Sequence, residues 1–296
     1  MGIIANSKTK VICQGILTPA GLNHTEQALA YGTNIVAGVA NGKGGQTILG
    51  DIPLFNTVEE AIKATQATIS VIFASPSNAS SEIEKAIDAN IKWIICPTER
   101  VPVHEILKIK DKLKKSKSRL IGPAAPGLIS AGECKIGTMP AHLFLQGNVG
   151  IMSRSSSVLY EAVQQLTGKG VGVSSCVAIG AYPILETEFT DILDLFNKDK
   201  KTDIILMIGE IGGSFEQRLA EYYEKLSKKK PLICYVSGQH VPTGTYMGNI
   251  SAIIENDFET ANFKNEALKK AGAVIVTSPA NIGAAVFKLL SQVEVK

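Results

Sequence analysis

A glycine-framed turn close to the amino terminus could bind a phosphate group. Gly15 and Gly21 lie around the first expected strand-to-helix turn, in the stretch KVICQGILTPAGLNHTEQALAYG. The free amides at the start of a helix can receive a phosphate. A complete dinucleotide-binding fingerprint has another glycine between these two, but Thr18, Pro19 and Ala20 fill that stretch. The motif taken alone is therefore a weak predictor of a dinucleotide.

The end of the second expected strand bears on the type of nucleotide. It reads IVAGVANGKGGQT and lacks the acidic residue that would hold an adenosine ribose, which disfavours nicotinamide cofactors and a hydride-transferring dehydrogenase. Lys43, framed by glycines, would suit a ligand with an additional phosphate on its ribose. The alternative is a surface turn with a solvated lysine.

Two polar residues of the second half could belong to a reactive site. Glu210 follows an apolar run in MIGEIGG, where it is either a functional carboxylate or an ordinary strand-end carboxylate at a helix start. Asn249 lies in YMGNISA, a loop beyond the apolar strand PLICYVSG. The local sequence does not tell whether Asn249 is a turn residue or occupies a reactive position.

Composition limits what these motifs can mean. With 296 residues, 45% of them hydrophobic, the chain is long enough for two globular cores. The net charge is +3, and the basic residues are scattered along the chain except in two lysine-rich stretches. This pattern favours solvated helix surfaces over a nucleic-acid site. The five cysteines include no Cys-x-x-Cys pair, and no Cys or His cluster has metal-ligand spacing. We therefore expect no metal centre, and reduced, buried thiols at Cys13, Cys96 and Cys234, which lie in apolar runs.

Sequence features also bear on the compartment. No apolar run approaches the roughly 20 residues that span a bilayer. The amino terminus, MGIIANSKTKVIC, lacks both a hydrophobic signal core and the arginine-rich pattern of a transit peptide. We expect no membrane association and a location in the bacterial cytoplasm, with the mitochondrial matrix as the alternative.

Short β-branched runs alternate with longer helical ones, which predicts parallel sheets covered by helices. The strand candidates of the first half are residues 10–14, 34–38, 67–75, 91–97 and 119–122. The sequence from Pro123 to Gly147 is rich in loop-forming residues, and the alternation of strand-like and helical runs resumes after it. We expect two α/β domains, at residues 1–122 and 148–296, joined by a connector at 123–147.

Motifs spread over almost the whole chain point to one protein family. In order, they are KVICQG, YGTNIVAGV, GKGGQT, PLFNTVEEA, CPTE, LIGPAAPG, GECKIGTMPAH, MSRSSSVLYEAV, MIGEIGGS and GAVIVTSPANIG. Together they resemble the α subunit of succinyl-CoA synthetase (succinate–CoA ligase). The resemblance implies an N-terminal CoA-binding Rossmann-type domain and a C-terminal flavodoxin-like domain, both with mainly parallel sheets.

The resemblance also implies an activity and a partner. Members of the family form succinyl-CoA from succinate, CoA and ATP or GTP, through succinyl phosphate and a phosphorylated histidine of the α subunit. The implied cofactors are CoA and, through a β subunit, ATP or GTP with Mg²⁺. The implied assembly is a heterodimer or heterotetramer with that β subunit.

Site residues carry over position by position. Gly15, Gly21 and Lys43 match the family's contacts to CoA, and Thr98 with Glu99 matches a turn beside that cofactor.

The second half carries the matches to the phosphoryl site. Ser153 and Ser155, on either side of Arg154, match the loop that leads into a helix whose N-terminus faces the phosphohistidine. Tyr160 matches a residue near the substrate, and Glu210 matches the carboxylate that orients the imidazole.

The family's phosphorylated histidine corresponds to Asn249. A neutral imidazole offers a nitrogen lone pair near neutral pH, whereas the lone pair of an amide nitrogen is delocalised into the carbonyl. The relay should therefore be impaired. Of the four histidines, His240 shares this loop, but to replace the missing nucleophile it would have to reach Glu210.

Other departures from the family pattern also lie at positions that correspond to the family's reactive site. They are Ala124 and Ala125 in GPAAPG, Ser156 in the serine loop, and the turn Gly180-Ala181-Tyr182. These changes leave two functions open: a ligase α subunit with weakened or lost phosphoryl transfer, or a non-catalytic paralogue that acts as a CoA-binding, regulatory or structural subunit.

Overall fold

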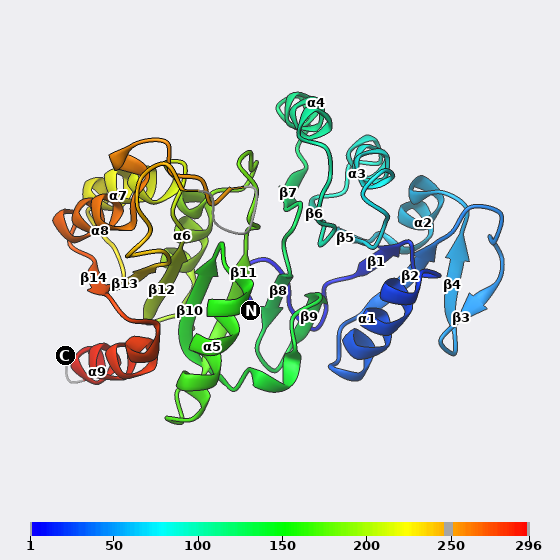
Figure 1. The fold of residues 1–296 in the computed structure, drawn as a ribbon. Helices are drawn as coiled ribbons and strands as arrows, with labels where there is room; N and C mark the ends of the chain where they lie inside the picture. The colour runs from blue at the N-terminus through cyan, green and yellow to red at the C-terminus, as the bar shows by residue number, and fades with distance from the viewer. Residues whose placement is uncertain (1, 246–250, 295–296) are drawn as a thin grey trace.

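Two α/β units follow one another along the chain (Figure 1). The computed structural model describes residues 2–245 and 251–294. Within these ranges, no helix has both the length and the apolar character needed to cross a bilayer. All five cysteines are free and buried, which confirms the prediction for Cys13, Cys96 and Cys234.

The first unit is a mainly parallel sheet with helices packed against it. Its strands are β1 (Val11–Gln14), β2 (Ile35–Val39), β3 (Thr47–Ile48), β4 (Ile52–Phe55), β5 (Ile69–Ile72), β6 (Trp93–Ile95) and β7 (Arg119–Ile121). Its helices are α1 (Pro19–Ala30), α2 (Val58–Thr65), α3 (Ala79–Asp88) and α4 (Val103–Leu113). The strand order is β3-β4-β2-β1-β5-β6-β7, with β3 antiparallel to β4. Without the short strand β3, this order reads 3-2-1-4-5-6, which is that of Rossmann-type folds.

The second unit has a flavodoxin-like order. Its strands are β8 (Gly127–Ser130), β9 (Cys134–Gly137), β10 (Gln146–Ser153), β11 (Val173–Ala178), β12 (Ile204–Gly209), β13 (Leu232–Val236) and β14 (Val274–Val276). Its helices are η1 (Ala141–Leu143), α5 (Ser156–Thr167), α6 (Phe189–Lys198), α7 (Phe215–Lys225), η2 (Asp257–Glu259), α8 (Ala261–Lys270), η3 (Pro279–Asn281) and α9 (Ile282–Glu294). The parallel strands β10 to β14 are arranged 2-1-3-4-5. The predicted fold class is confirmed.

Residues 123–147, which the sequence predicts as a loop-rich connector, contain β8 and β9. These strands pair antiparallel with each other, and β8 pairs with β11 at the edge of the second sheet. Gly127 and Gly137 face each other in this hairpin with φ of +104° and +110°. A β-carbon on Gly127 would lie 2.1 Å from the Ile136 carbonyl oxygen, so this close backbone approach requires glycine.

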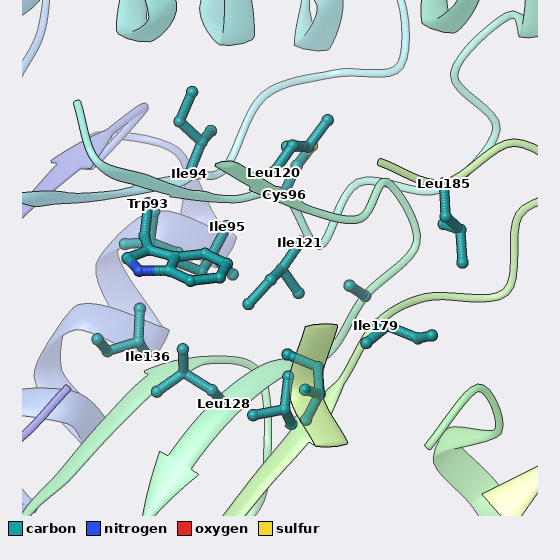
Figure 2. Close-up of a cluster of buried hydrophobic side chains, with 14 of the residues drawn as sticks. Trp93, Ile94, Ile95, Cys96, Leu120, Ile121, Leu128, Ile136, Ile179 and Leu185 are labelled. Carbon is teal, nitrogen blue, oxygen red and sulfur yellow. The ribbon is translucent and has the colours of Figure 1, made fainter. Parts of the chain in front are cut away.

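A layer of buried side chains joins the two units (Figure 2). Trp93 and Ile95 of β6 and Ile121 of β7 belong to the same core cluster as Leu128 of β8 and Ile136 of β9. Figure 2 shows these side chains filling the space between the strands of the two units. The two units therefore share part of one core, and burial of this apolar surface opposes their separation.

Charged side chains cross the same boundary. Arg119 of β7 pairs with Glu186 (Nε to Oε1, 2.8 Å) and with Asp191 of α6 (Nη2 to Oδ2, 3.0 Å). The second oxygen of Glu186 accepts a hydrogen bond from the Leu120 amide at 2.9 Å. Ion pairs and a backbone contact therefore tie β7 to the segment that leads into α6.

Lys135 of β9 is a buried cation at this boundary. Its backbone N–H and C=O both bond to the Thr33 hydroxyl, at 2.9 Å each, which connects β9 to the first unit. Lys135 is only 1% exposed, and its Nζ donates a hydrogen bond to the Gly137 carbonyl oxygen at 3.0 Å. Burial lowers the pKa of Lys135 from 10.5 to about 8, because the charged form loses hydration.

The lowered pKa of Lys135 predicts a pH-dependent stability. Between pH 8 and 10.5 the unfolded chain binds more protons at this residue than the folded chain, so its contribution to stability rises with pH. We expect Lys135→Met to be more stable than the parent at pH 7, with a smaller advantage at pH 9. Urea unfolding midpoints of both chains at both pH values measure this difference in stability. The buried cysteines are the same in both chains, so their own pH-dependent effects cancel in the comparison. A pH-independent difference would contradict the assignment, and Lys8→Met, at an exposed position, is the control.

Candidate functional site

The first candidate site is a cavity of about 720 Å³ where the strand order of the first sheet reverses, between β1 and β5. In open parallel sheets, ligands bind at such points beyond the carboxyl ends of the strands. The lining residues accordingly include residues at or just beyond the ends of β1, β2 and β5, namely Gly15, Thr18, Val39, Asn41, Phe73 and Ser75.

The two glycines predicted at this turn serve the approach of backbone segments. Gly15 lines the cavity at φ +74°, and a β-carbon there would lie 2.2 Å from the Phe73 carbonyl oxygen. A β-carbon on Gly21 would lie 2.2 Å from the Gly15 carbonyl oxygen. Thr18 caps α1 by accepting from the Gly21 amide at 3.0 Å and donates to the Gly15 carbonyl at 2.8 Å. The sequence thus fixes a tight turn beside the cavity.

Lys43 lies in the exposed loop that follows β2. The loop is held against the rim of the cavity, because the Gly44 amide donates to the Asn56 side chain at 3.0 Å and Asn56 lines the cavity. The Lys43 amide donates to the carbonyl of Ala40, another lining residue, at 3.1 Å. The ammonium is therefore attached to a loop next to the cavity.

A polar network at the carboxyl end of β1 could not be recognised in the sequence. Gln14 is fully buried, accepts from the Ser70 hydroxyl at 2.7 Å and donates to the Glu82 carboxylate at 2.8 Å. Glu82 also pairs with Lys85 at 2.6 Å, and both line the cavity. The sequence around Gln14 does not indicate this network, because the partners of Gln14 lie more than 50 residues away along the chain.

The second candidate site is a cavity of about 400 Å³ at the strand reversal of the second sheet, between β10 and β12. Arg154 and Ser155 follow β10, and Glu210 follows β12. The first unit also contributes lining residues, Glu99 and Arg100 among them. The cavity therefore lies between the units that share the core of Figure 2.

Ser153 and Ser155 build the start of α5. The buried Ser153 hydroxyl accepts from the Ser155 amide at 3.0 Å and donates to the Ser155 carbonyl at 2.8 Å. Ser155 is the N-cap residue, but its side chain makes no capping hydrogen bond to the helix. Ser155 lines the cavity together with Ser156 and Ser157, at the positive end of the helix dipole.

Thr98 and Glu99 connect the two cavities. The Thr98 hydroxyl donates at 2.9 Å to the carbonyl of Ala74, which lines the first cavity, while Glu99 lines the second. The Thr98 carbonyl accepts from the Ala124 amide at 2.9 Å. Ala124 and Arg100 both line the second cavity with positive φ, of 53° and 58°. Such strain in residues other than glycine clusters at functional sites.

Glu210 lines the second cavity and is largely buried. The residue is 7% exposed. Next to it lies a buried ion cluster of Arg154, Glu216 and Lys264, which the sequence did not reveal because charged residues in helices usually face solvent. Burial opposes ionisation of Glu216, but the charges of Lys264 and Arg154 more than offset this and lower its pKa.

The remaining predicted residues lie elsewhere or outside the described ranges. Tyr160 projects from α5 and packs against the core of the second unit, where burial raises its pKa to about 12. Asn249 lies outside the described residues. His240 is exposed, and it is not among the residues that line the two cavities. Within the described ranges, no group of three or more acidic, His or Cys residues could hold a metal ion.

Comparison with known proteins identifies related sequences over the full length of the chain. Family models described as CoA binding domain and as CoA-ligase match residues 6–100 and 152–274. The succinate–CoA ligase [ADP-forming] subunit alpha of Aquifex aeolicus is 45% identical over 100% of this chain and 97% of its own. The subunit of the same name from Staphylococcus aureus strain Mu50 is 45% identical over 96% and 93%.

A solved structure has the same fold. ATP citrate lyase from Methanothrix soehngenii, in complex with citrate and coenzyme A, superposes with a TM-score of 0.88 at 24% identity. The match covers 98% of this chain and half of that chain. At this identity the likeness concerns the fold alone.

The geometry at the start of α5 predicts different roles for two neighbouring serines. Ser153→Ala removes both bonds to the Ser155 backbone and should lower the free energy of unfolding by about 1–3 kcal/mol, because the Ser155 amide loses its partner. Ser155→Ala should change it by less than about 0.5 kcal/mol, below the usual effect of removing a cap, because this cap is not formed. Chemical denaturation of both variants measures the difference, and equal effects would contradict the assignment.

Proposed function

Because the chain belongs to the family of succinate–CoA ligase α subunits, we propose that it binds CoA and pairs with a β subunit that supplies ATP or GTP with Mg²⁺. The observation that carries this proposal is the 45% identity to named α subunits over the whole chain. The matches to the CoA binding domain and CoA-ligase models support it for each unit separately. We assign residues 1–122 to CoA binding, 123–147 to the connector and 148–296 to the ligase domain.

We place CoA in the first cavity. Gly15 lines this cavity, and Gly21 keeps the turn tight from behind, so that the turn would lie against a phosphate of CoA. Lys43 would pair with the additional ribose phosphate. Thr98 and Glu99 lie where a molecule that extends from the first cavity would approach the second.

We place the phosphoryl chemistry of the family in the second cavity. The complete reaction converts succinate, CoA and a nucleoside triphosphate into succinyl-CoA, the diphosphate and phosphate. Ser153 and Ser155 shape the helix start that would face the phosphoryl group, Tyr160 supports α5 close to the substrate site, and Glu210 would orient the nucleophile. The nitrogen lone pair of a carboxamide at position 249 is delocalised into the carbonyl and cannot accept a phosphoryl group, so the relay through this position is impaired.

The replacements around position 249 favour a second candidate function. Ser156, Ala181 and Tyr182 line the second cavity, and each departs from the family pattern, whereas the turns of the first cavity follow it. The chain would then be a non-catalytic paralogue that binds CoA and β without transferring phosphate. Phosphoryl labelling and CoA binding separate this function from a working ligase subunit.

The proposed role of Lys43 predicts selective recognition of one phosphate. Lys43→Ala should weaken CoA binding about tenfold, as expected for a lost hydrogen bond to a charged group, but should leave binding of dephospho-CoA, which lacks the ribose phosphate, almost unchanged. Isothermal titration of both ligands measures this. Lys63→Ala, at an exposed position on α2, is the matched control. Equal losses for both ligands would refute the contact.

The proposed defect at position 249 predicts a gain of function. The parent chain, mixed with a β subunit and γ-labelled ATP, should take up no acid-labile phosphate, whereas Asn249→His should be labelled. Label in the parent that disappears in His240→Gln would contradict the account. An unlabelled Asn249→His chain that binds CoA and β would favour the paralogue, with neighbouring replacements also disabling transfer.

A further inference from the structure

Three charged side chains from separate elements meet beside the second cavity. Glu216 of α7 and Lys264 of α8 are both 0% exposed, and Lys264 Nζ lies 2.5 Å from Glu216 Oε2. Arg154, which lines the cavity, lies with Nη1 3.5 Å from the other oxygen, Oε1. The cluster thus brings two basic side chains to the two oxygens of one buried carboxylate.

Lys264 uses its full hydrogen-bonding capacity on one short segment. An ammonium group has three N–H donors. They reach the carbonyl oxygens of Glu210 at 2.8 Å and Gly212 at 2.7 Å, and the carboxylate of Glu216. The lysine of α8 is therefore bonded to the loop that joins β12 to α7 and to the start of that helix.

Glu216 holds the same loop from the other side. Its Oε1 accepts a hydrogen bond from the Glu210 amide at 3.1 Å. The peptide groups on both sides of the Glu210 α-carbon are thus held by charged groups, the N–H by Glu216 and the C=O by Lys264. The packing is tight, since a β-carbon on Gly209 would lie 2.7 Å from Glu216 Cγ.

We propose that Lys264 is a positioning residue that fixes the Glu210 carboxylate at the second cavity. Dehydrating an ammonium costs several kcal/mol, and an apolar residue at this position of α8 would avoid that cost. The contacts of Lys264 go to the segment that carries Glu210, so its charge serves the placement of that residue. The inference rests on the proposed function, in which Glu210 orients the nucleophile.

Hydrogen exchange tests the positioning without any activity. Lys264→Met leaves the Arg154–Glu216 pair, so no charge becomes unpaired. The Glu210 amide should exchange about tenfold faster or more, whereas the amide of Cys234, in the interior strand β13, should not change. NMR exchange rates of both amides measure this. An unchanged Glu210 rate, or an equal rise at both amides, would overturn the proposal.

Phosphoryl labelling in the Asn249→His background tests the consequence. Adding Lys264→Met should slow labelling about tenfold or more, with the same half-saturating ATP concentration, because the nucleotide binds to β. Lys269→Met, at an exposed position of the same helix, should be labelled in this background at the rate of Asn249→His alone. Equal rates for Lys264→Met and Lys269→Met would overturn the positioning role. If Asn249→His itself takes no label, the non-catalytic paralogue is favoured, and the exchange rates still decide the role of Lys264.

Discussion

The reversal of strand order in each parallel sheet is the constraint on which both cavities depend. At a reversal, the loops after two neighbouring strands leave toward opposite faces, and a crevice remains between them. Gly15 follows one of the strands at the first reversal, and Ser155 and Glu210 follow the two strands at the second. The core shared by β6 to β9 (Figure 2) then fixes the two crevices relative to each other. Glu99 can therefore line a cavity that belongs mainly to the other unit.

Polar and charged side chains from several elements hold the backbone around the second cavity. A fully bonded lysine, a buried glutamate and a serine-built helix start all hold backbone at that cavity. Such buried charges destabilise a protein unless each is paired. Under the proposed function, these contacts would support a phosphoryl site in which Asn249 offers no group that accepts the phosphate.

Much of the fold could be predicted because parallel strands are continuous apolar runs. The candidates of the first half correspond to β1, β2, β5, β6 and β7, whereas β3 and β4 escaped notice because they are short and bounded by glycine and proline. The strands β8 and β9 were also missed, because their glycines are typical of loops. In addition, β11, the partner of β8, lies some 45 residues further along the chain. The position of Glu210 directly after a strand could also be predicted from the sequence. Lys264 could not, because ANFKNEALKK resembles a solvated helix and only the fold brings that helix to the loop after β12.

The central claim is that a carboxamide at position 249 cannot carry a transferable phosphoryl group. The most direct measurement is succinyl-CoA formation by the unmodified chain with a purified β subunit, succinate, CoA and ATP or GTP, in the absence of any other α chain. The account predicts CoA binding without steady turnover. Sustained, stoichiometric formation of succinyl-CoA and nucleoside diphosphate would contradict it.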